Sequence, residues 1–403
     1  MKRRSMQLRW FYMAVAVLVL LFTGVNYTWS ILKAPLAQAY HWTDSQLALN
    51  FTLAMSTFCL GGFLGGVLTG RFGGRRTLLL SAALCGLGYF LTSRINGRSL
   101  LALYLCYGIL GGLGIGIAYN VIISTVSAWF PDKKGLCSGL LMMGFGISAL
   151  LVGEAVSRLI EGPGWRVAFL AVSISLAITL TLAALILRRP GPEDDLPVPE
   201  ISTAAMTDVK GLDCTTGEMI RRRSFWKAFL CIAFLSAVGN AVVSFARDFC
   251  LSTGAGVALA TTLVGVFSVC NGLSRILTGA LFDRIGRKAT MRGAILLTVA
   301  AAGILLAASA LRALPLCVLG ICLAGFSYGS SPTITSVFTA AFYGARHFPV
   351  NFPVMNFNLM LASFMATAAN ALLETSGGYV VPFAFLLALA LLSLLLNSSI
   401  RKP

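Results

Sequence analysis

Apolar runs long enough to cross a membrane recur along this chain from one end to the other. A bilayer core about 30 Å thick requires roughly 20 apolar residues in a helix. The 403 residues are 57% hydrophobic and only 11% charged, and the mean hydropathy is +0.85. A soluble chain of this length needs far more charge to cover its surface. We therefore predict an all-α integral membrane protein.

The apolar runs divide into twelve predicted transmembrane helices in two sets of six. The first set is 11–36, 45–70, 75–94, 99–130, 135–159 and 166–187, and the second is 225–246, 256–282, 289–310, 314–341, 350–373 and 379–400. Between them lies 188–224, a long polar stretch dominated by Pro, Asp, Glu and Thr, which is typical of a flexible linker. The predicted architecture is two six-helix bundles, 1–187 and 225–403, joined by this linker.

The basic residues are distributed as an orientation signal for membrane insertion. With both termini in the cytoplasm, seven of the 31 Lys and Arg residues fall outside and Arg275 falls within a span. The seven outer residues are Lys33, Arg94, Arg98, Arg158, Arg166, Arg247 and Arg312. This asymmetry predicts a multi-pass protein of the cell (inner) membrane with both termini cytoplasmic. The net charge of +17 forms no continuous basic face, so we expect no nucleic acid partner.

Several other features narrow the function class. The N-terminal basic and apolar run lacks a small-residue cleavage site, so we interpret it as the first uncleaved span. The ten cysteines fall mostly inside apolar segments without metal-ligand spacing, and there are only two histidines. We expect small buried thiols, no metal, no cofactor and no enzymatic activity, because no nucleophile and base are paired.

An internal repeat relates the two halves. Gly66-Val-Leu-Thr-Gly-Arg-Phe-Gly73 matches Gly279-Ala-Leu-Phe-Asp-Arg-Ile-Gly286 at an offset of 213 residues. The same offset pairs Ala128-Trp-Phe130 with Ala341-Phe-Tyr343, and Met142 with Met355. Separate regions that share one offset indicate a duplication. Two pseudo-symmetric six-span halves are typical of transporters, which bind substrate between the halves near the membrane midplane.

These residues resemble the major facilitator superfamily. Its loop signature, Gly-x-x-x-Asp-Arg-x-Gly-Arg-Lys/Arg, is complete as Gly279, Asp283, Arg284, Gly286, Arg287 and Lys288. The first copy keeps Gly66, Arg71, Gly73, Arg75 and Arg76 but has Gly70 in place of the aspartate. A carboxylate and arginines at such a turn can pair and cap a neighbouring helix. We interpret the motif as a gating latch, weaker in the first copy.

Within that superfamily the chain looks most like the oxalate/formate antiporter family, which is related to the monocarboxylate transporters. The local evidence is Tyr27-Thr-Trp-Ser30, Tyr119-Asn120, Trp129-Phe-Pro-Asp-Lys-Lys-Gly135, Gly144-Phe-Gly146, Asn271-Gly-Leu-Ser-Arg275 and Asn351. The resemblance implies a secondary carrier that is either an antiporter or a proton symporter. It also implies that Arg275, the arginine of its motif, contacts an anionic substrate.

Arg275 is the first candidate for substrate binding. It lies eight residues before Asp283, about 12 Å along the helix from the loop. A guanidinium at that depth is costly unless it faces a watery cavity or a partner, and a transported carboxylate would be such a partner. The alternative is that Arg275 pairs with carbonyl groups or reaches the cytoplasmic interface.

The resembled family's oxalate carriers also have a lysine in the eleventh span, where this chain has Leu359. No Lys or Arg occurs from 347 to 373. One fixed positive charge suits a monoanion better than a dianion, because a dianion leaves one charge uncompensated in a low-dielectric site. We therefore expect a monocarboxylate rather than oxalate.

Polar and aromatic residues on the spans that line the cavity in the resembled family complete the candidate site. They are Tyr27, Trp29, Tyr119, Asn120, Tyr328, Asn356 and Asn358. Each could hydrogen-bond or wall a small ligand, or could simply pack between helices.

Glu154 departs from the resembled family, which usually has a proline there. A membrane carboxylate can take up a proton if burial raises its pKa. Arg158 follows one turn later, which instead favours an ion pair near the outer gate. Both interpretations stay open at this point.

Three other functions compete with an organic-anion carrier. A multidrug or other hydrophobic-compound exporter of the same superfamily would give Arg275 only a structural role. A membrane sensor would need an output domain, for which the linker is too short. ATP-driven transport would need a nucleotide-binding glycine loop, which we do not find. We expect a monomer in the lipid bilayer with a small-molecule substrate.

Overall fold

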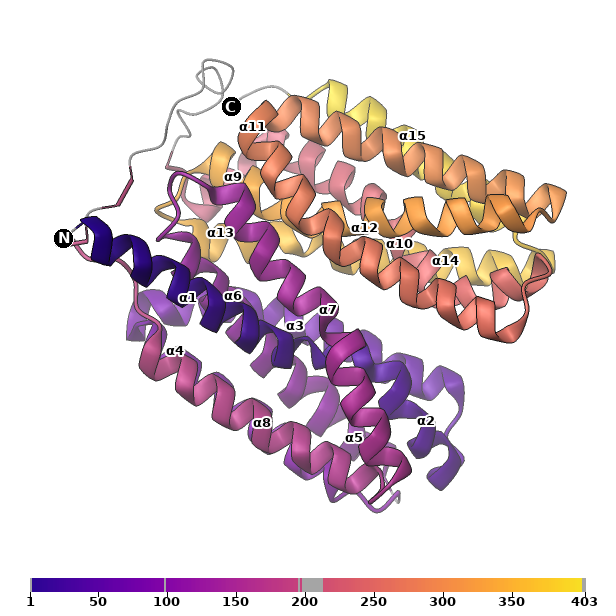
Figure 1. The fold of residues 1–403 in the computed structure, drawn as a ribbon, viewed down its shortest axis with the longest axis horizontal. Coiled ribbons are helices and arrows are strands. Elements are labelled where there is room, and N and C mark those ends of the chain that lie inside the picture. The colour runs from indigo at the N-terminus through magenta and orange to yellow at the C-terminus, as the bar shows by residue number, and fades with distance from the viewer. Residues whose placement is uncertain (1, 98, 195, 198–212, 401–403) are drawn as a thin grey trace. The chain divides into compact units, whose positions relative to one another are not determined.

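A computed structural model describes residues 2–97, 99–194, 196–197 and 213–400, and the regular secondary structure of these residues is helical (Figure 1). The helices are α1 (Lys2–Thr23), η1 (Gly24–Thr28), α2 (Trp29–Tyr40), α3 (Asp44–Phe72), α4 (Gly74–Ser93), α5 (Leu100–Leu103), η2 (Tyr104–Gly111), α6 (Gly112–Ser127), α7 (Lys134–Glu161), α8 (Trp165–Ile186), α9 (Thr216–Arg221), α10 (Arg223–Ser252), α11 (Val257–Leu311), α12 (Leu314–Tyr343), α13 (Phe348–Asn356), α14 (Asn358–Ser376) and α15 (Val380–Ser398).

The predicted all-α membrane architecture is confirmed. The described residues contain eleven helices long and apolar enough to cross a membrane. One of them, within α11, holds both the eighth and the ninth predicted spans, which meet at the non-helical Gly286 (φ 75°, ψ 178°). Dividing α11 at Gly286 accounts for all twelve predicted spans.

The chain divides into two compact units. Unit 1 is Met1–Asp132, Leu140–Pro199 and Phe348–Val354, and unit 2 is Lys133–Gly139, Glu200–His347 and Met355–Pro403. The first residues of α7 therefore belong to unit 2, and most of α13 belongs to unit 1. Much of the predicted linker, at 195 and 198–212, lies outside the described residues.

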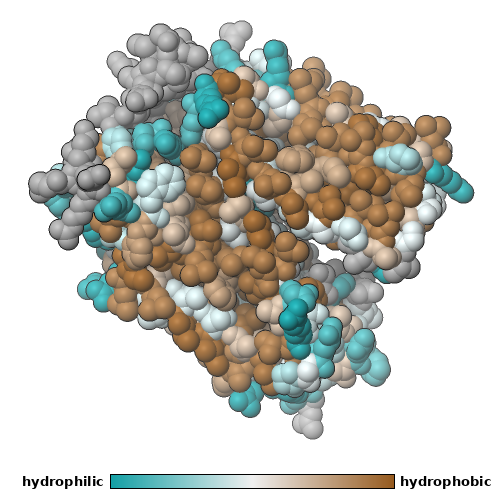
Figure 2. Space-filling model, in the orientation of Figure 1, coloured by the Kyte–Doolittle hydropathy of each residue, from teal (hydrophilic) through white to brown (hydrophobic). Residues whose placement is uncertain are grey.

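Apolar side chains cover much of the outer surface, and hydrophilic ones gather toward the helix ends (Figure 2). The most exposed leucines include Leu18, Leu101, Leu185, Leu311 and Leu395. A soluble protein avoids contiguous apolar surface of this kind. The exposed apolar side chains are those that lipid tails would cover. Eight of the ten cysteines are buried, as expected.

Helix α12 is the polar hub of unit 2. Its buried hydroxyl groups bond to α10 (Ser331 with Ser236), to α11 (Ser327 with Thr298, 2.6 Å) and to the first turns of α7 (Ser336 with Ser138, 3.0 Å). Hydroxyl pairs of this kind hold membrane helices together where the hydrophobic effect does not act.

Three predicted spans are interrupted by irregular helix. The first contains the 3-10 turn η1, the fourth contains the π-helix η2, and the eleventh breaks between α13 and α14 at Phe357. At the eleventh-span break, Asn358 donates from its side chain to the carbonyl of Met355 (2.6 Å). Side-chain bonds to nearby carbonyls compete with the helical ladder.

Candidate functional site

An aromatic cluster gathers two of the predicted site residues in unit 1. Tyr27 of η1 and Tyr119 of α6 both pack on Phe145 of α7, with ring centroids 5.3 and 4.9 Å apart. Phe352 of α13 stacks on Tyr119 at 6.2 Å. Gly24 allows η1 to approach α7, since a Cβ there would lie 2.3 Å from the carbonyl oxygen of Phe145. The phenol groups of Tyr27 and Tyr119 thus share one aromatic wall.

Trp29 does not join this cluster. Its indole N–H donates to the carbonyl of Leu47 in α3 (3.2 Å), and its ring lies 4.5 Å from that of Tyr107. Residues two apart on a helix point to different sides, so Tyr27 and Trp29 face different neighbours. The structure therefore separates two residues that the sequence analysis grouped.

Asn120 is held by main-chain carbonyls. Its side-chain nitrogen donates to Gly62 (2.9 Å) and to Pro349 (2.7 Å). Pro353 has no N–H, so the helical bond to the carbonyl four residues earlier, that of Pro349, cannot form. Asn120 satisfies this acceptor, and its carboxamide N–H groups tie α6 to α3 and α13 within unit 1.

Arg275 lies inside unit 2, on α11, with only 2% of its surface exposed. Its Nε donates to Asn271 Oδ1 one turn earlier (3.0 Å), and the hydroxyl of Thr333 donates to its carbonyl (3.3 Å). Gly139 of α7 packs on the same carbonyl, because a Cβ there would be 2.3 Å from the oxygen. The backbone and Nε are thereby fixed, which orients the guanidinium.

The other predicted residues of unit 2 are also buried. Tyr328 donates from its hydroxyl to Asn240 Oδ1 (2.8 Å) and stacks on Phe267, with ring centroids 6.2 Å apart. Asn356 and Asn358 flank the break in the eleventh span, and both are at least 96% buried. Asn358 also donates to the hydroxyl of Thr335 (3.4 Å).

The complete loop signature caps a helix. Asp283 accepts hydrogen bonds from the main-chain N–H groups of Gly135 and Leu136, both 2.8 Å long, at the start of α7. A carboxylate at a helix N-terminus satisfies orphan donors and interacts favourably with the helix dipole. Arg287 is buried over the ring of Phe342 (4.9 Å to the centroid), whereas Arg284 and Lys288 are exposed.

The first copy of the signature keeps the backbone features without the cap. Gly73 and Gly286 both adopt left-handed φ angles, 81° and 75°, which favour glycine at this turn. Gly66 packs on the start of α13, since a Cβ there would be 2.0 Å from the carbonyl oxygen of Pro349. Arg71, Arg75 and Arg76 are exposed.

Glu154 and Arg158 form an ion pair on one turn of α7, with Arg158 Nε 3.0 Å from Glu154 Oε1. Both side chains are more than 60% exposed. This geometry supports the ion-pair interpretation over a buried proton-coupling carboxylate.

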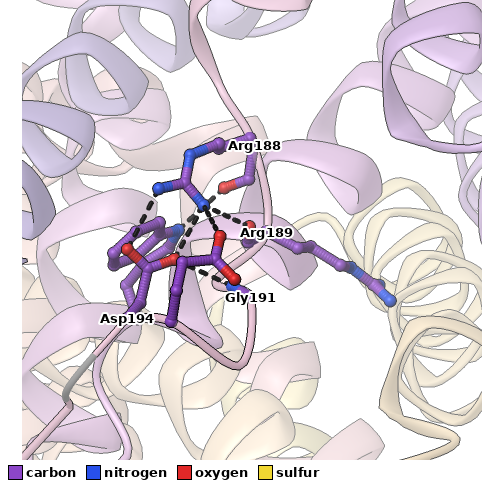
Figure 3. Close-up of polar contacts among 6 residues, drawn as sticks. Arg188, Arg189, Gly191 and Asp194 are labelled. Atoms are coloured by element: carbon purple, nitrogen blue, oxygen red, sulfur yellow. Dashed lines mark hydrogen bonds and ion pairs between the residues drawn. The ribbon is translucent and has the colours of Figure 1, made fainter.

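The described ends of the linker are each bound to the unit next to them. In unit 1 the carbonyl of Arg188 accepts from the indole of Trp129 (2.7 Å), and its guanidinium makes a bidentate pair with Asp194, at 2.7 and 3.0 Å (Figure 3). The bond from Arg188 and that from the Gly191 N–H hold the pKa of Asp194 below its ordinary value. In unit 2, the main-chain N–H of Cys214 donates to the carbonyl of Tyr343 (3.0 Å).

Asn271 and Asn240, which orient Arg275 and Tyr328, were not among the predicted site residues. Asn271 was visible in the motif that contains Arg275, four residues away and hence on the same helix face. Asn240 had no such signal, because its contact with Tyr328 joins positions 88 residues apart.

Among the described residues, no group of three or more His, Cys, Asp and Glu is arranged to hold a metal ion. The polar groups that the described residues bury include carboxamides, hydroxyls and the guanidinium groups of Arg9, Arg275 and Arg287.

The family model for the Major Facilitator Superfamily matches residues 14–367. Because the match covers most of the chain, the chain belongs to this superfamily of membrane transporters.

Curated relatives are similar over long alignments. The oxalate:formate antiporter of Oxalobacter formigenes is 28% identical over 284 residues, 70% of this chain and 65% of that protein. The alignment therefore spans slightly less than two thirds of the antiporter. Monocarboxylate transporter 12 of Homo sapiens is 24% identical over 344 residues, 79% of this chain and 66% of that protein.

Solved transporter structures share the fold. The proton:xylose symporter XylE of E. coli superposes with a TM-score of 0.80 at 17% identity, covering 99% of this chain and 97% of that one. The E. coli fucose:proton symporter FucP gives 0.65 at 14% identity, with 97% and 98% covered. At this identity the likeness concerns the fold alone.

Proposed function

We propose that this chain is a secondary active transporter for a small organic anion, with a monocarboxylate as the substrate class, working by alternating access. The observation that carries the proposal is the 98% buried Arg275 on a membrane-spanning helix. An arginine at a helix centre costs about 2.5–3.5 kcal/mol on the scale derived from insertion experiments. A carboxylate ligand offsets that cost by pairing with the guanidinium through charge-assisted hydrogen bonds.

The buried basic residues favour a monoanion. Those that the structure describes are Arg9, Arg275 and Arg287. Arg9 is paired with Asp132 at 2.7 Å, and Arg287 lies at the loop signature over Phe342. Of these three, Arg275 is the one that falls within a predicted span (256–282), and one charge compensates one carboxylate.

The relatives support the same class. One is named an oxalate:formate antiporter and another a monocarboxylate transporter. Formate and other monocarboxylates need one cationic group, which Arg275 supplies. Oxalate needs a second, and position 359 in the eleventh span is leucine. We therefore propose that monocarboxylates are preferred to oxalate.

We also propose that both termini face the cytoplasm of a cell (inner) membrane, with the loop signatures on the same side. The excess of Lys and Arg in the loops on that side supports this orientation. Fusions of green fluorescent protein and of alkaline phosphatase to the C-terminus test it. The fluorescent fusion should be active and the phosphatase inactive, and the reverse pattern would refute the orientation.

Uptake into proteoliposomes tests the substrate class. Purified protein is reconstituted, and uptake of labelled formate, lactate, pyruvate and oxalate is measured with a proton gradient and, separately, with unlabelled carboxylate inside. Lactamide, the uncharged analogue of lactate, serves as the competitor that lacks the charge. We expect monocarboxylates to be carried and to compete at least tenfold better than oxalate or lactamide.

Two variants on α11 make the test specific. Arg275→Ala should reduce monocarboxylate uptake by about 10- to 100-fold, since hydrogen bonds to a charged group contribute about 1.5–3 kcal/mol. Arg292→Gln removes an exposed arginine from the same helix and should leave uptake unchanged. If no carboxylate is carried and Arg275→Ala still exports a hydrophobic drug at the wild-type rate, the chain is instead a hydrophobic-compound exporter.

A further inference from the structure

Two asparagines of unit 1 are buried with unsatisfied side chains. Asn26 in η1 is 1% exposed and Asn50 in α3 is 0% exposed. Neither the oxygen nor the nitrogen of either carboxamide has a hydrogen-bond partner among the described residues. A buried polar group left unpaired costs about 1–3 kcal/mol, so four such atoms in two side chains indicate a bound molecule.

Helical register, counted from the contact between Trp29 and Leu47, brings the two asparagines to the same level of unit 1. The Trp29 indole bonds to the Leu47 carbonyl, and the chain turns back between α2 and α3 within three residues. The two helices therefore run antiparallel. Asn26 lies three residues before Trp29, and Asn50 lies three residues after Leu47. Because the two helices run in opposite directions, both steps lead toward the same end of the helix pair.

Irregular helices border this niche on two sides. Asn50 Oδ1 lies against Gly108 of η2, where a Cβ would be 3.0 Å from that oxygen. The hydroxyl of Thr57 holds the carbonyl of Gly108 (2.6 Å). Asn50 of α3 therefore lies beside the π-helix η2, and helical register brings Asn26 of the 3-10 turn η1 to the same level. Stretches of π-helix are frequent at functional sites.

The chemistry of a carboxamide selects the ligand. Each offers two N–H donors and an acceptor oxygen. A cation would satisfy only the two oxygens, and an anion would satisfy only the N–H groups. Either ion would also be a buried charge among uncharged groups, which is costly. An uncharged molecule that both donates and accepts hydrogen bonds can satisfy all four atoms.

We propose that Asn26 and Asn50 form a buried binding site for an uncharged hydrogen-bonding ligand, with ordered water as that ligand. A buried water typically makes about three hydrogen bonds to otherwise unsatisfied groups. Trp29 lies three residues from Asn26, and Tyr107 precedes Gly108, which Asn50 contacts. Arg275, which carries the proposed carboxylate site, belongs to unit 2, whereas both asparagines belong to unit 1. The failure or success of the water site therefore leaves the proposed function untouched.

Radiolytic labelling of the full chain in nanodiscs detects such water. Hydroxyl radicals formed from bound water oxidise adjacent side chains, and rapid mixing with H₂¹⁸O before irradiation separates slowly exchanging from bulk water. We expect Trp29 and Tyr107 to incorporate the original ¹⁶O although both are buried. Absence of label on both, or label from bulk ¹⁸O only, would overturn the proposal without any variant.

A variant cycle provides the second readout. Asn26→Leu/Asn50→Leu should lower labelling of Trp29 and Tyr107 at least about fivefold while labelling of Trp129 stays constant. Each single variant should lower Tm by about 2–4 °C, because the remaining carboxamide loses its bridging partner. The double variant should recover most of that loss. If each single variant raises Tm and the two effects add, the asparagines share no ligand.

Discussion

The two copies of the loop signature occupy equivalent places in the two units but stabilise their helix starts differently. In unit 2, Asp283 accepts from the N–H groups of Gly135 and Leu136. The same offset of 213 residues pairs Asp283 with Gly70, Gly135 with Phe348 and Leu136 with Pro349. Proline has no N–H to donate, and it is well tolerated in a first helical turn. The loss of the aspartate therefore accompanies the loss of a donor that it would have capped.

The two copies share the close backbone approach at their first glycine. A Cβ at Gly279 would lie 2.0 Å from the Gly135 carbonyl oxygen, and a Cβ at Gly66 would lie 2.0 Å from that of Pro349. The comparison shows that the duplicated motif preserves helix contact in both copies and an electrostatic cap in one. The close helix contact at the glycines and the charge of the Asp283 cap can therefore be tested by separate substitutions.

The largest effect is expected for Gly66→Ala and Gly279→Ala. The new methyl group cannot fit beside a main-chain oxygen, so the helices must separate in either unit. We expect Tm to fall by more than about 5 °C in both variants, with uptake nearly abolished. Gly70→Ala is the matched control, because nothing lies within 4 Å of its added Cβ. If Gly66→Ala behaves like Gly70→Ala, the shared contact is not essential in the first copy.

A smaller but still large effect is expected for Asp283→Ala. It removes two charge-assisted bonds to α7, which together contribute a few kcal/mol. Uptake should fall at least tenfold and Tm should fall by several degrees. Asp283→Asn keeps an acceptor oxygen without the charge, so its uptake and its Tm should lie between those of the wild type and those of Asp283→Ala. Equal behaviour of Asp283→Asn and the wild type would show that charge plays no part in the cap.

Restoring the cap in unit 1 should give a modest gain. Gly70→Asp alone places a carboxylate next to a helix start that lacks one donor. Adding Pro349→Ala supplies that donor, so the double variant should exceed the sum of the single changes by about 1–2 °C in Tm. Purely additive effects would argue against the link between positions 70 and 349.

The smallest effect compares the two linker ends at low pH. Hydrogen bonds to Arg188 and Gly191 lower the pKa of Asp194 from 3.8, and the bonds from Thr215 lower that of Glu218 from 4.5. Each carboxylate stabilises its anchor above its ordinary pKa, and the contribution is lost as pH falls through the lowered value. Cleavage of the linker by an acid protease should therefore rise below about pH 4. The rise should shrink in Asp194→Asn, and an unchanged profile would exclude a role for that anchor.

Much of the fold was predictable because each span must satisfy its own backbone in lipid, which forces long apolar helices. The offset of 213 residues then related the two sets. The interruptions η1 and η2 were not predicted, since they depend on contacts such as that of Gly24 with Phe145, which apolar periodicity does not encode. The bend at Gly286 was predicted, because the loop signature from Asp283 to Lys288 separates the eighth and ninth spans.

The candidate site was predictable residue by residue but not as an arrangement. Arg275 stood out because a charge is rare inside a span. Tyr27 and Trp29 were grouped because both are aromatic residues on a span that lines the cavity in the resembled family, although helical geometry gives them different neighbours. Asn120 was predicted to bind the ligand, but its side chain donates to two main-chain carbonyls. One of them, that of Pro349, is free to accept because Pro353 in the eleventh span has no N–H.

That last relation constrains how the sequence can change. While Pro353 is present, the Pro349 carbonyl requires an outside donor, and Asn120 is the donor. Replacing Asn120 first would bury an orphaned oxygen, whereas replacing Pro353 first would return the carbonyl to its own helix and release Asn120. The two positions therefore have a preferred order of substitution: a change at 120 costs less after a change at 353 than before it.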